Sequence, residues 1–540
     1  MLAASNASAS PPDTGPVKLS PEHLGALNRR RRIVVQFDAH SELGADFDRW
    51  LDYRFDYADE PGSQIDSLWW DIGALGYAVY PSEVLEPFEH EGLMAWRRQG
   101  IDWVARLVEE SHHRGLETFW HHRISEVETV TSGVGADRRN AHPLKKAHPD
   151  WVLDTWWEHG LWNLAVPEVR QYKVAVLREV AENYDFDGIQ VDFARHIPCL
   201  PPGRQWELRD CVTDLMRMLR RTLLDVEAAR GRPFLLAAKV PRSIEGCRVD
   251  GFDVETWMGE DLVDILTLGT RCMDVDIEGF RLAAAGHPVK LQPCFDDHHT
   301  TDAYQHASIE FLRGVFANWW RQGADSVVAF NWSHAAPEVC HAMGARPGPD
   351  AQRQAYHEVG SPETLRLKDK VFAVDRRGGY PWAEGYFGRN DWAPLPVELA
   401  DDGLAERIRI RVADDTAVEA DKIDRICLRL ILFGATERDT VGAQLNGVDL
   451  DRELIDPEWK DKLIRSPKPQ PPSGGADSCT IDPQQRLLRI EYRVDPAVCR
   501  VGWNHVDVRV EARAGERGQA AVKLEKVEVH VHYKAGAQPI

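Results

Sequence analysis

The sequence has few features of a metal-binding or disulfide-stabilised protein. Its nine cysteines are scattered, odd in number and free of any Cys-x-x-Cys spacing. This pattern argues against a structural zinc site and against a dense disulfide framework. We therefore expect buried free thiols and no resident metal or cofactor.

Long apolar runs and a secretion signal are also missing. No apolar stretch is long enough to cross a bilayer. Residues 1–30 begin with an Ala-, Ser- and Pro-rich stretch that lacks the basic start and apolar core of a signal peptide. We expect these residues to form a disordered leader, in a protein that is cytoplasmic or has had a signal removed.

The sequence has fewer basic than acidic residues. Lys and Arg number 65 against 86 Asp and Glu, which gives a net charge of −21. A chain of this charge is repelled by phosphate backbones and anionic lipids, so nucleic acid and membranes are poor partners. Its oligomeric state is left open. The length of 540 residues exceeds what one compact core normally holds, and several domains are expected.

Short apolar runs alternate with helical stretches over residues 31–340, which is typical of βαβ units around a parallel sheet. Eight strands are expected, at residues 33–37, 67–70, 116–120, 188–191, 234–238, 263–268, 289–293 and 326–330. Eight such units predict a closed (β/α)8 TIM barrel of the α/β class. A doubly wound open sheet is the alternative, but no glycine-rich phosphate loop follows the first strand.

The periodicity changes after the barrel. Residues 341–395 are rich in Pro, Gly and charge and predict a connector that packs on the barrel. Over residues 396–540 apolar and polar side chains alternate, and Asn446-Gly447 is a hairpin-turn signal. We expect an antiparallel β-sandwich here, serving as an accessory domain.

One segment resembles a known family. It contains Trp162-Asn163-Leu164, then Pro167-Glu168-Val169-Arg170 at the start of a helix, and then the run from Tyr184 through Asp187-Gly188 to Asp192-Phe193-Ala194-Arg195. These motifs resemble the signature of glycosyl-hydrolase-like family ten, whose members are TIM-barrel proteins. Phe193 stands where the family usually has Tyr. The resemblance implies a glycoside hydrolase with Asp192, at the end of the fourth strand, as nucleophile.

Glycoside hydrolysis needs two carboxyl groups, one to stabilise or attack the oxocarbenium-like centre and one to protonate the leaving oxygen. Asp192 is our candidate for the first, and a nearby Arg195 would keep it ionised. Asp274, after the sixth strand, is the preferred candidate for the second. Other candidates for this acid remain open: Asp71, Asp296, Asp297, Glu245 and Glu255.

Further polar and aromatic residues at predicted strand ends are candidate substrate contacts, because active sites of such barrels lie at the C-terminal ends of the strands. They are Asp38, Asp71, Trp120, His122, Arg195, His196, Lys239, Asp296, Asn331 and Trp332. Of the paired His121 and His122, one is expected to point away from the pocket. Asp187 lies at the opposite end of its strand and is expected to be structural.

The sequence thus favours a hydrolase that cleaves glycosidic bonds in an oligo- or polysaccharide, with carbohydrate as its partner. One alternative is a non-catalytic carbohydrate-binding protein on a barrel scaffold. Another is a metal-dependent barrel hydrolase, for which the Asp- and His-rich run 295–302 would be the ligand source.

Overall fold

A computed structural model gives the structure of this chain. It describes residues 17–537, except 40, 74–75, 127–141, 156–158, 270–271, 298–302, 333–334, 346, 377–391, 465–482 and 515–519. The described part contains no helix that is both long and apolar enough to cross a membrane. Eight described cysteines are free, and all but Cys211 are buried.

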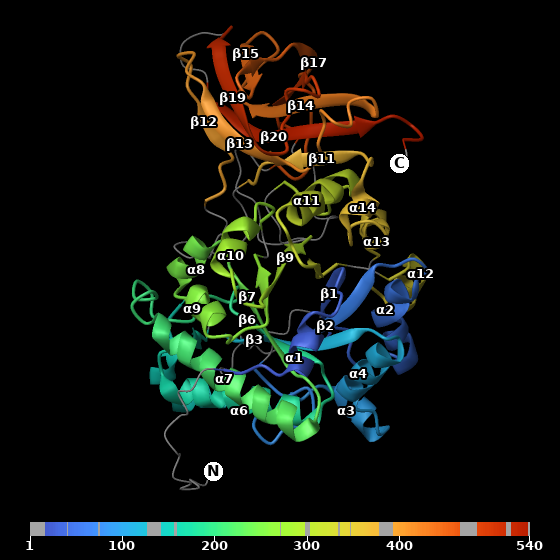
Figure 1. Ribbon diagram of the computed structural model, residues 1–540, viewed down its shortest axis with the longest axis vertical. Coiled ribbons are helices and arrows are strands. Elements are labelled where there is room, and N and C mark those ends of the chain that lie inside the picture. Colours follow the sequence, from blue (N-terminus) through green and yellow to red (C-terminus); the bar gives the residue numbers. More distant parts are fainter. Residues whose placement is uncertain are drawn as a thin grey trace.

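The predicted closed barrel is confirmed. Parallel strands pair in the closed order β1-β10-β9-β8-β7-β6-β3-β2 (Figure 1). Each coincides with one of the eight predicted segments: β1 Ile33–Asp38, β2 Ile65–Gly73, β3 Glu117–Arg123, β6 Gly188–Asp192, β7 Leu235–Val240, β8 Ile265–Leu268, β9 Lys290–Asp296 and β10 Val327–Phe330. A small antiparallel pair, β4 Val152–Leu153 and β5 Leu161–Trp162, precedes β6.

Helices connect the strands around the barrel (Figure 1). They are α2 Phe47–Asp59, α3 Glu91–Arg98, α4 Trp103–His113, α5 Pro143–Ala147, α6 Pro167–Asn183, α7 Arg209–Arg230, α8 Ile244–Asp250, α9 Val254–Gly259, α10 Ile277–Ala283 and α11 Ile309–Arg321. Helix α6 begins at the predicted Pro167, and Tyr184 is its C-cap. Its buried face is apolar at Val169, Val176, Leu177 and Val180, which recur at helical spacing.

The N-terminal end of the barrel is closed by α1, Pro21–Leu27, which lies within the segment expected to be a disordered leader. The prediction was therefore wrong for this part of residues 1–30. Leu27 packs with the apolar side chains inside the barrel. Fully buried His23 places Nδ1 2.6 Å from Oε2 of Glu227 and Nε2 2.9 Å from Oδ1 of Asp264. These polar contacts, which a hydrophobicity pattern does not detect, hold α1 in place.

The β-sandwich has two antiparallel sheets, with strand orders β11-β20-β14-β18-β17, extended by β12, and β13-β19-β15-β16. Its strands are β11 Lys370–Ala373, β12 Val397–Leu399, β13 Glu406–Val412, β14 Ile423–Phe433, β15 Thr440–Leu445, β16 Val448–Asp449, β17 Arg452–Asp456, β18 Leu487–Arg493, β19 Gly502–Ala512 and β20 Val522–Tyr533. Asn446 and Gly447 have φ of 52° and 84° between β15 and β16, as a tight hairpin turn requires.

The segment expected to be a connector begins within the last residues of α12, Pro337–Ala342, and contains α13 Asp350–Tyr356 and α14 Pro362–Leu365. It also supplies β11, which pairs with β20 and so belongs to the sandwich. The sandwich packs against the barrel beside α11 (Figure 1). Nδ2 of Asn318 in α11 donates to the carbonyl of Arg411 in β13 at 3.0 Å.

Candidate active site

Polar side chains gather inside the barrel at the C-terminal ends of its strands. Alternate residues of each strand point inwards, and the inner apolar layer contains Val34, Trp69, Phe119, Ala237 and Cys294. The same alternation directs the next polar residues into the mouth of the barrel: Asp38 of β1, Asp71 of β2, His121 and Arg123 of β3, Asp192 of β6, Lys239 of β7 and Asp296 of β9.

Asp192 is fully buried in this group. Its Oδ1 accepts hydrogen bonds from the backbone N–H groups of Ala194 at 2.8 Å and Arg195 at 3.0 Å. Nε2 of His121 lies 3.3 Å from its Oδ2. Burial alone would raise the pKa of Asp192, but the charge of Lys239 and the contact with His121 outweigh it and hold the pKa well below its usual range.

Asp71 lies on β2, next to the strand that carries His121, and its pKa is shifted in the opposite direction to that of Asp192. Its Oδ2 contacts Nη2 of Arg123 and lies 3.8 Å from Nε2 of His121. Burial is the main reason that its pKa is raised well above the usual value, and the neighbouring carboxylates of Asp38 and Asp192 add to the shift against the charge of Arg123. Asp71 therefore keeps its proton to a higher pH than an ordinary Asp does, close to the ionised Asp192.

A chain of hydrogen bonds supports His121 from below. Its Nδ1 lies 2.7 Å from Nε2 of Gln36 and 2.6 Å from Oε1 of Gln190. Gln190 donates to Oγ1 of Thr267 at 2.5 Å, and Gln292 donates to the same oxygen at 2.7 Å. Burial lowers the pKa of His121, so the ring is neutral. This network crosses the barrel and fixes the ring that touches both carboxyl groups.

Lys239 and Asp38 are further charged side chains in this group. Nζ of Lys239 lies 3.5 Å from Oε1 of Gln36 and 3.8 Å from the centroid of the Phe330 ring. Nη2 of Arg123 donates to Oδ1 of Asp38 at 2.7 Å, and the Asp38 side chain is 26% exposed. Asp38 is thus the member of this group that borders solvent.

Oδ2 of Asp192 and Nε2 of His121 are buried and face each other at 3.3 Å at the centre of the site. Neither atom forms a further hydrogen bond with the described residues. Buried polar atoms are nearly always paired with protein or water. These two atoms therefore have hydrogen-bonding capacity that a polar ligand could use.

The structure brings together several residues that the sequence suggested. Asp38, Asp71, Asp192, Lys239 and Asp296 all lie on inward-facing positions. Arg195 reaches Asp192 through its backbone N–H, whereas the cationic side chains that lower the pKa of Asp192 are Lys239 and Arg123.

His196 and Asn331 follow strands β6 and β10 with φ of 58° and 54°. Left-handed backbone outside glycine costs about 1–3 kcal/mol and is concentrated at functional sites. Their role as substrate contacts stays a prediction.

Three predicted contacts face away from the barrel interior and are corrected here. Trp120 is buried against Tyr80 and Phe186. Trp332 is buried too, and its Nε1 donates to the carbonyl of Phe295 at 3.2 Å. Both indoles are core residues, because the outer face of each strand is covered by helices.

His122 is the third correction. It points outwards, with Nε2 2.7 Å from Oε1 of Glu126, whose other oxygen contacts Lys173. The histidine in the site is His121. It and Arg123 were not among the candidate contacts, although alternation along β3 places both on one face.

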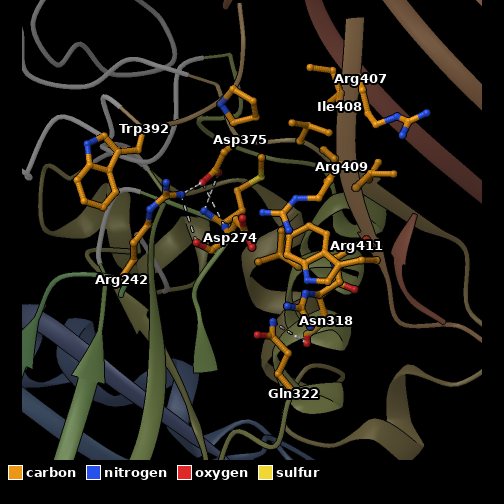
Figure 2. A pocket seen from close by; sticks show the side chains of 17 residues that line it. Arg242, Asp274, Asn318, Gln322, Asp375, Trp392, Arg407, Ile408, Arg409 and Arg411 are labelled. Carbon is orange, nitrogen blue, oxygen red and sulfur yellow. Dashed lines mark hydrogen bonds and ion pairs between the residues drawn. The ribbon is translucent and has the colours of Figure 1, made fainter. Parts of the chain in front are cut away.

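Asp274 lies elsewhere. It follows β8 and lines a cavity beside the sandwich, together with Arg242 and Asp375 (Figure 2). More than a third of the residue is exposed. The surrounding protein limits the hydration of the Asp274 carboxylate, and this is the larger cause of the rise in its pKa to about 6. The negative charge of Asp375 adds to the rise. No described contact joins it to Asp192, and Asp71 is the carboxyl group that shares His121 with Asp192.

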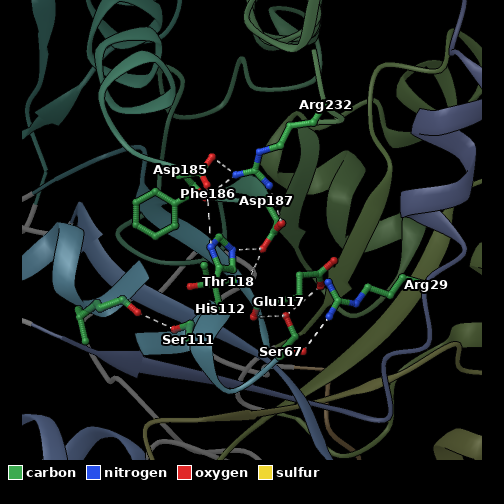
Figure 3. Close-up of polar contacts among 12 residues, drawn as sticks. Arg29, Ser67, Ser111, His112, Glu117, Thr118, Asp185, Phe186, Asp187 and Arg232 are labelled. Carbon is green, nitrogen blue, oxygen red and sulfur yellow. Dashed lines mark hydrogen bonds and ion pairs between the residues drawn. The ribbon is translucent and has the colours of Figure 1, made fainter. Parts of the chain in front are cut away.

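The acidic residues at the start of β6 are structural, as expected for Asp187. Its Oδ2 lies 3.0 Å from Nε2 of His112 and accepts the N–H of Thr118 at 2.9 Å (Figure 3). Asp185 pairs with Arg232 (Figure 3). These contacts tie α4, β3 and β7 together at the N-terminal end of the barrel, away from Asp192.

The described residues contain no group of three or more His, Cys, Asp and Glu side chains that could hold a metal ion. Within the predicted run 295–302, residues 298–302 lie outside the described part of the chain. Asp297 is held by protein groups: its Oδ2 accepts from Nε2 of Gln352 at 2.5 Å.

Among solved structures, the fold is similar to an α-L-fucosidase, isoenzyme 2 from Paenibacillus thiaminolyticus. The TM-score is 0.41 at 16% identity, over 64% of this chain and 51% of that chain. The glycoside hydrolase domain of PgaB (BpsB) from Bordetella bronchiseptica gives a TM-score of 0.39 at 12% identity, over 62% of this chain and 99% of that domain.

Sequence comparisons place the similarity in the first half of the barrel. Residues 58–200 match the family model of glycosyl hydrolase-like 10. A curated protein, glycosyl hydrolase YngK of Bacillus subtilis (strain 168), is 31% identical over 118 residues, which is 21% of this chain and 22% of that protein. The chain therefore aligns with about a fifth of its relative. The family match contains both Asp71 and Asp192, and together with the Bacillus relative it supports a glycoside hydrolase family for this barrel.

Proposed function

We propose that this protein hydrolyses glycosidic bonds in an oligo- or polysaccharide, with Asp192 and Asp71 as its two carboxyl groups. The observation that carries the proposal is the opposite shift of their pKa values inside one group of side chains. The pKa of Asp192 is held low and that of Asp71 is raised. Two carboxyl groups whose environments separate their pKa values take the roles of base or nucleophile and acid.

In this proposal the ionised Asp192 attacks or stabilises the oxocarbenium-like anomeric centre, and the protonated Asp71 donates its proton to the leaving oxygen. Lys239 acts as a positioning residue for Asp192, since its positive charge contributes most among the nearby cations to keeping this buried carboxylate ionised. Arg123 contacts both Asp38 and Asp71, so it orients the acid rather than the nucleophile.

The test is the release of reducing sugar from a panel of polysaccharides and aryl glycosides by the wild type and by Asp192→Asn. The matched control is Asp185→Asn, the same chemical change in the same sequence motif but at the exposed, opposite end of the strand. We expect Asp192→Asn to lose activity by a factor of about 10²–10⁴ while it keeps its fold, and Asp185→Asn to retain most of it. A fully active Asp192→Asn would overturn the assignment. A wild type that binds glycans from the panel and cuts none would favour a carbohydrate-binding protein.

A further inference from the structure

A cavity of about 350 Å³ lies between the barrel and the sandwich (Figure 2). Residues that follow β7 and β8, together with α11, form its barrel side, and β13 with Trp503 of β19 forms the other. Four arginines and two aspartates line it. Positively charged side chains therefore outnumber negatively charged ones in its lining, although the chain as a whole has a net charge of −21.

Three of the arginines are already held by carboxylates: Arg242 by Asp375 at 2.7 Å, Arg407 by Asp507 at 2.7 Å and Arg411 by Glu278 at 3.1 Å. Arg409 differs from them. Its side chain is exposed and turned towards Asp274 across the cavity, and it forms no ion pair with any described residue (Figure 2). An arginine of this kind offers two parallel N–H groups to an incoming carboxylate.

The guanidinium groups are held in position by an aromatic ring. The carbon centres of Arg409 and Arg411 lie 4.7 Å and 4.3 Å from the centroid of the Trp503 ring. Stacking on indole limits the rotamers of a guanidinium without using its N–H groups. Arg409 is thus arranged for binding before any ligand arrives.

Buried polar groups in the same cavity also lack partners. Gln322 is only 6% exposed, and Oε1 of its side chain accepts no hydrogen bond from the described residues. Arg411 is 9% exposed, and its Nε donates no hydrogen bond to the described residues. Oδ1 of Asn318 likewise accepts no hydrogen bond from them. Buried polar groups are nearly always paired with protein, water or a ligand. The cavity therefore offers hydrogen-bond acceptors beside a cationic donor.

We propose that this cavity binds the carboxylate-bearing part of an acidic saccharide, with Arg409 holding the carboxylate and Asn318 and Gln322 pairing with hydroxyl groups. A hydroxyl group can donate to the two amide oxygens, which a bare anion cannot do. The saccharide part of this inference rests on the proposed function, whereas the anionic part rests on Arg409, which lines the cavity and forms no ion pair with a described residue. The sandwich then contributes directly to glycan binding through β13.

The experiment is isothermal titration calorimetry on full-length Asp192→Asn, in which turnover is removed. The probes are trimers of galacturonate, glucuronate and mannuronate, the neutral trisaccharide maltotriose, and inorganic phosphate. We expect at least one uronate trimer to bind at least tenfold more tightly than maltotriose and than phosphate. Adding Arg409→Gln should weaken that binding at least tenfold. Adding Arg493→Gln, the same charge change at a sandwich side chain that is 72% exposed, should leave it unchanged.

Three results would overturn the inference: no uronate trimer binds, the Arg409→Gln variant binds as well as its parent, or phosphate competes with equal affinity, which would make the site a simple anion site. The proposed function fails by a different readout, namely the absence of hydrolysis by the wild type. Uronate binding that depends on Arg409 can persist in that case, so the two failures are distinguishable.

Discussion

Nε2 of His121 lies 3.3 Å from Oδ2 of Asp192 and 3.8 Å from Oδ2 of Asp71. One neutral, buried imidazole therefore touches both carboxyl groups of the candidate pair. A ring fixed in this way holds together two carboxyl groups whose pKa values are shifted in opposite directions, and the predictions on activity depend on that arrangement.

The first prediction concerns the pH dependence of activity. Because the pKa of Asp71 is raised, its proton is kept to a higher pH than that of an ordinary Asp and is lost as the pH rises through that raised value. The low pKa of Asp192 keeps it ionised throughout the working range. We expect kcat/KM to fall on the alkaline side, and Asp71→Asn to remove this alkaline limb while lowering kcat/KM about 10²–10⁴-fold. Profiles of kcat/KM against pH for both proteins check this, and an unchanged alkaline limb in Asp71→Asn would assign it to another group.

The second prediction concerns α1 and stability. The pKa of buried His23 is raised by Asp264 and Glu227, which outweigh burial. Its protonated form therefore stabilises the fold below the unfolded-state pKa of about 6.5, and this stabilisation is lost as the pH rises through the folded-state pKa. We expect His23→Phe to lower the free energy of unfolding by about 1–3 kcal/mol at pH 5.5 and by less at pH 9.

Urea denaturation at the two pH values measures this difference. His113→Phe is the control, since the His113 side chain is 84% exposed. Equal destabilisation by His23→Phe at both pH values would show that the charge of His23 does not contribute.

The third prediction concerns Gly188 in the Asp187-Gly188 motif. A Cβ atom at Gly188 would lie 2.4 Å from Cε1 of Phe119 and 2.6 Å from the carbonyl oxygen of Leu235. Since the backbone oxygen cannot move away easily, we expect Gly188→Ala to destabilise the barrel by about 1–3 kcal/mol. Gly259→Ala is the matched control, because nothing lies within 4 Å of its added Cβ. Thermal unfolding of the two variants compares them, and equal melting temperatures would contradict the steric argument.

The sequence was sufficient for the barrel because each strand is a short apolar run between helices. It was also sufficient to place Asp38, Asp71 and Asp192 at the C-terminal end of the barrel, because each lies at the C-terminal end of a predicted strand. It could not separate His121 from His122. Every residue of β3 is buried, so hydrophobicity does not show which face of the strand points inwards.

The preferred candidate for the second carboxyl group, Asp274, does not lie beside Asp192, whereas Asp71, which the sequence left open as an alternative, does. Asp274 follows a predicted strand as Asp71 does, and the two are equivalent in the sequence. The packing of the sandwich beside α11 places Asp274 in the cavity next to β13. The position of Asp274 therefore depends on how the sandwich packs against the barrel. That packing involves contacts such as the one between Asn318 and Arg411, which are far apart in the chain.

The most direct test of the central claim is a double-mutant cycle with Asp192→Asn, Asp71→Asn and the double variant, using kcat/KM on one substrate from the panel. If the two carboxyl groups act as a unit, their losses are strongly non-additive. We predict that the double variant loses little more than the more damaged single variant, with all three proteins folded. Losses that multiply, or a single variant with wild-type activity, would contradict the account of Asp192 and Asp71 as one catalytic pair.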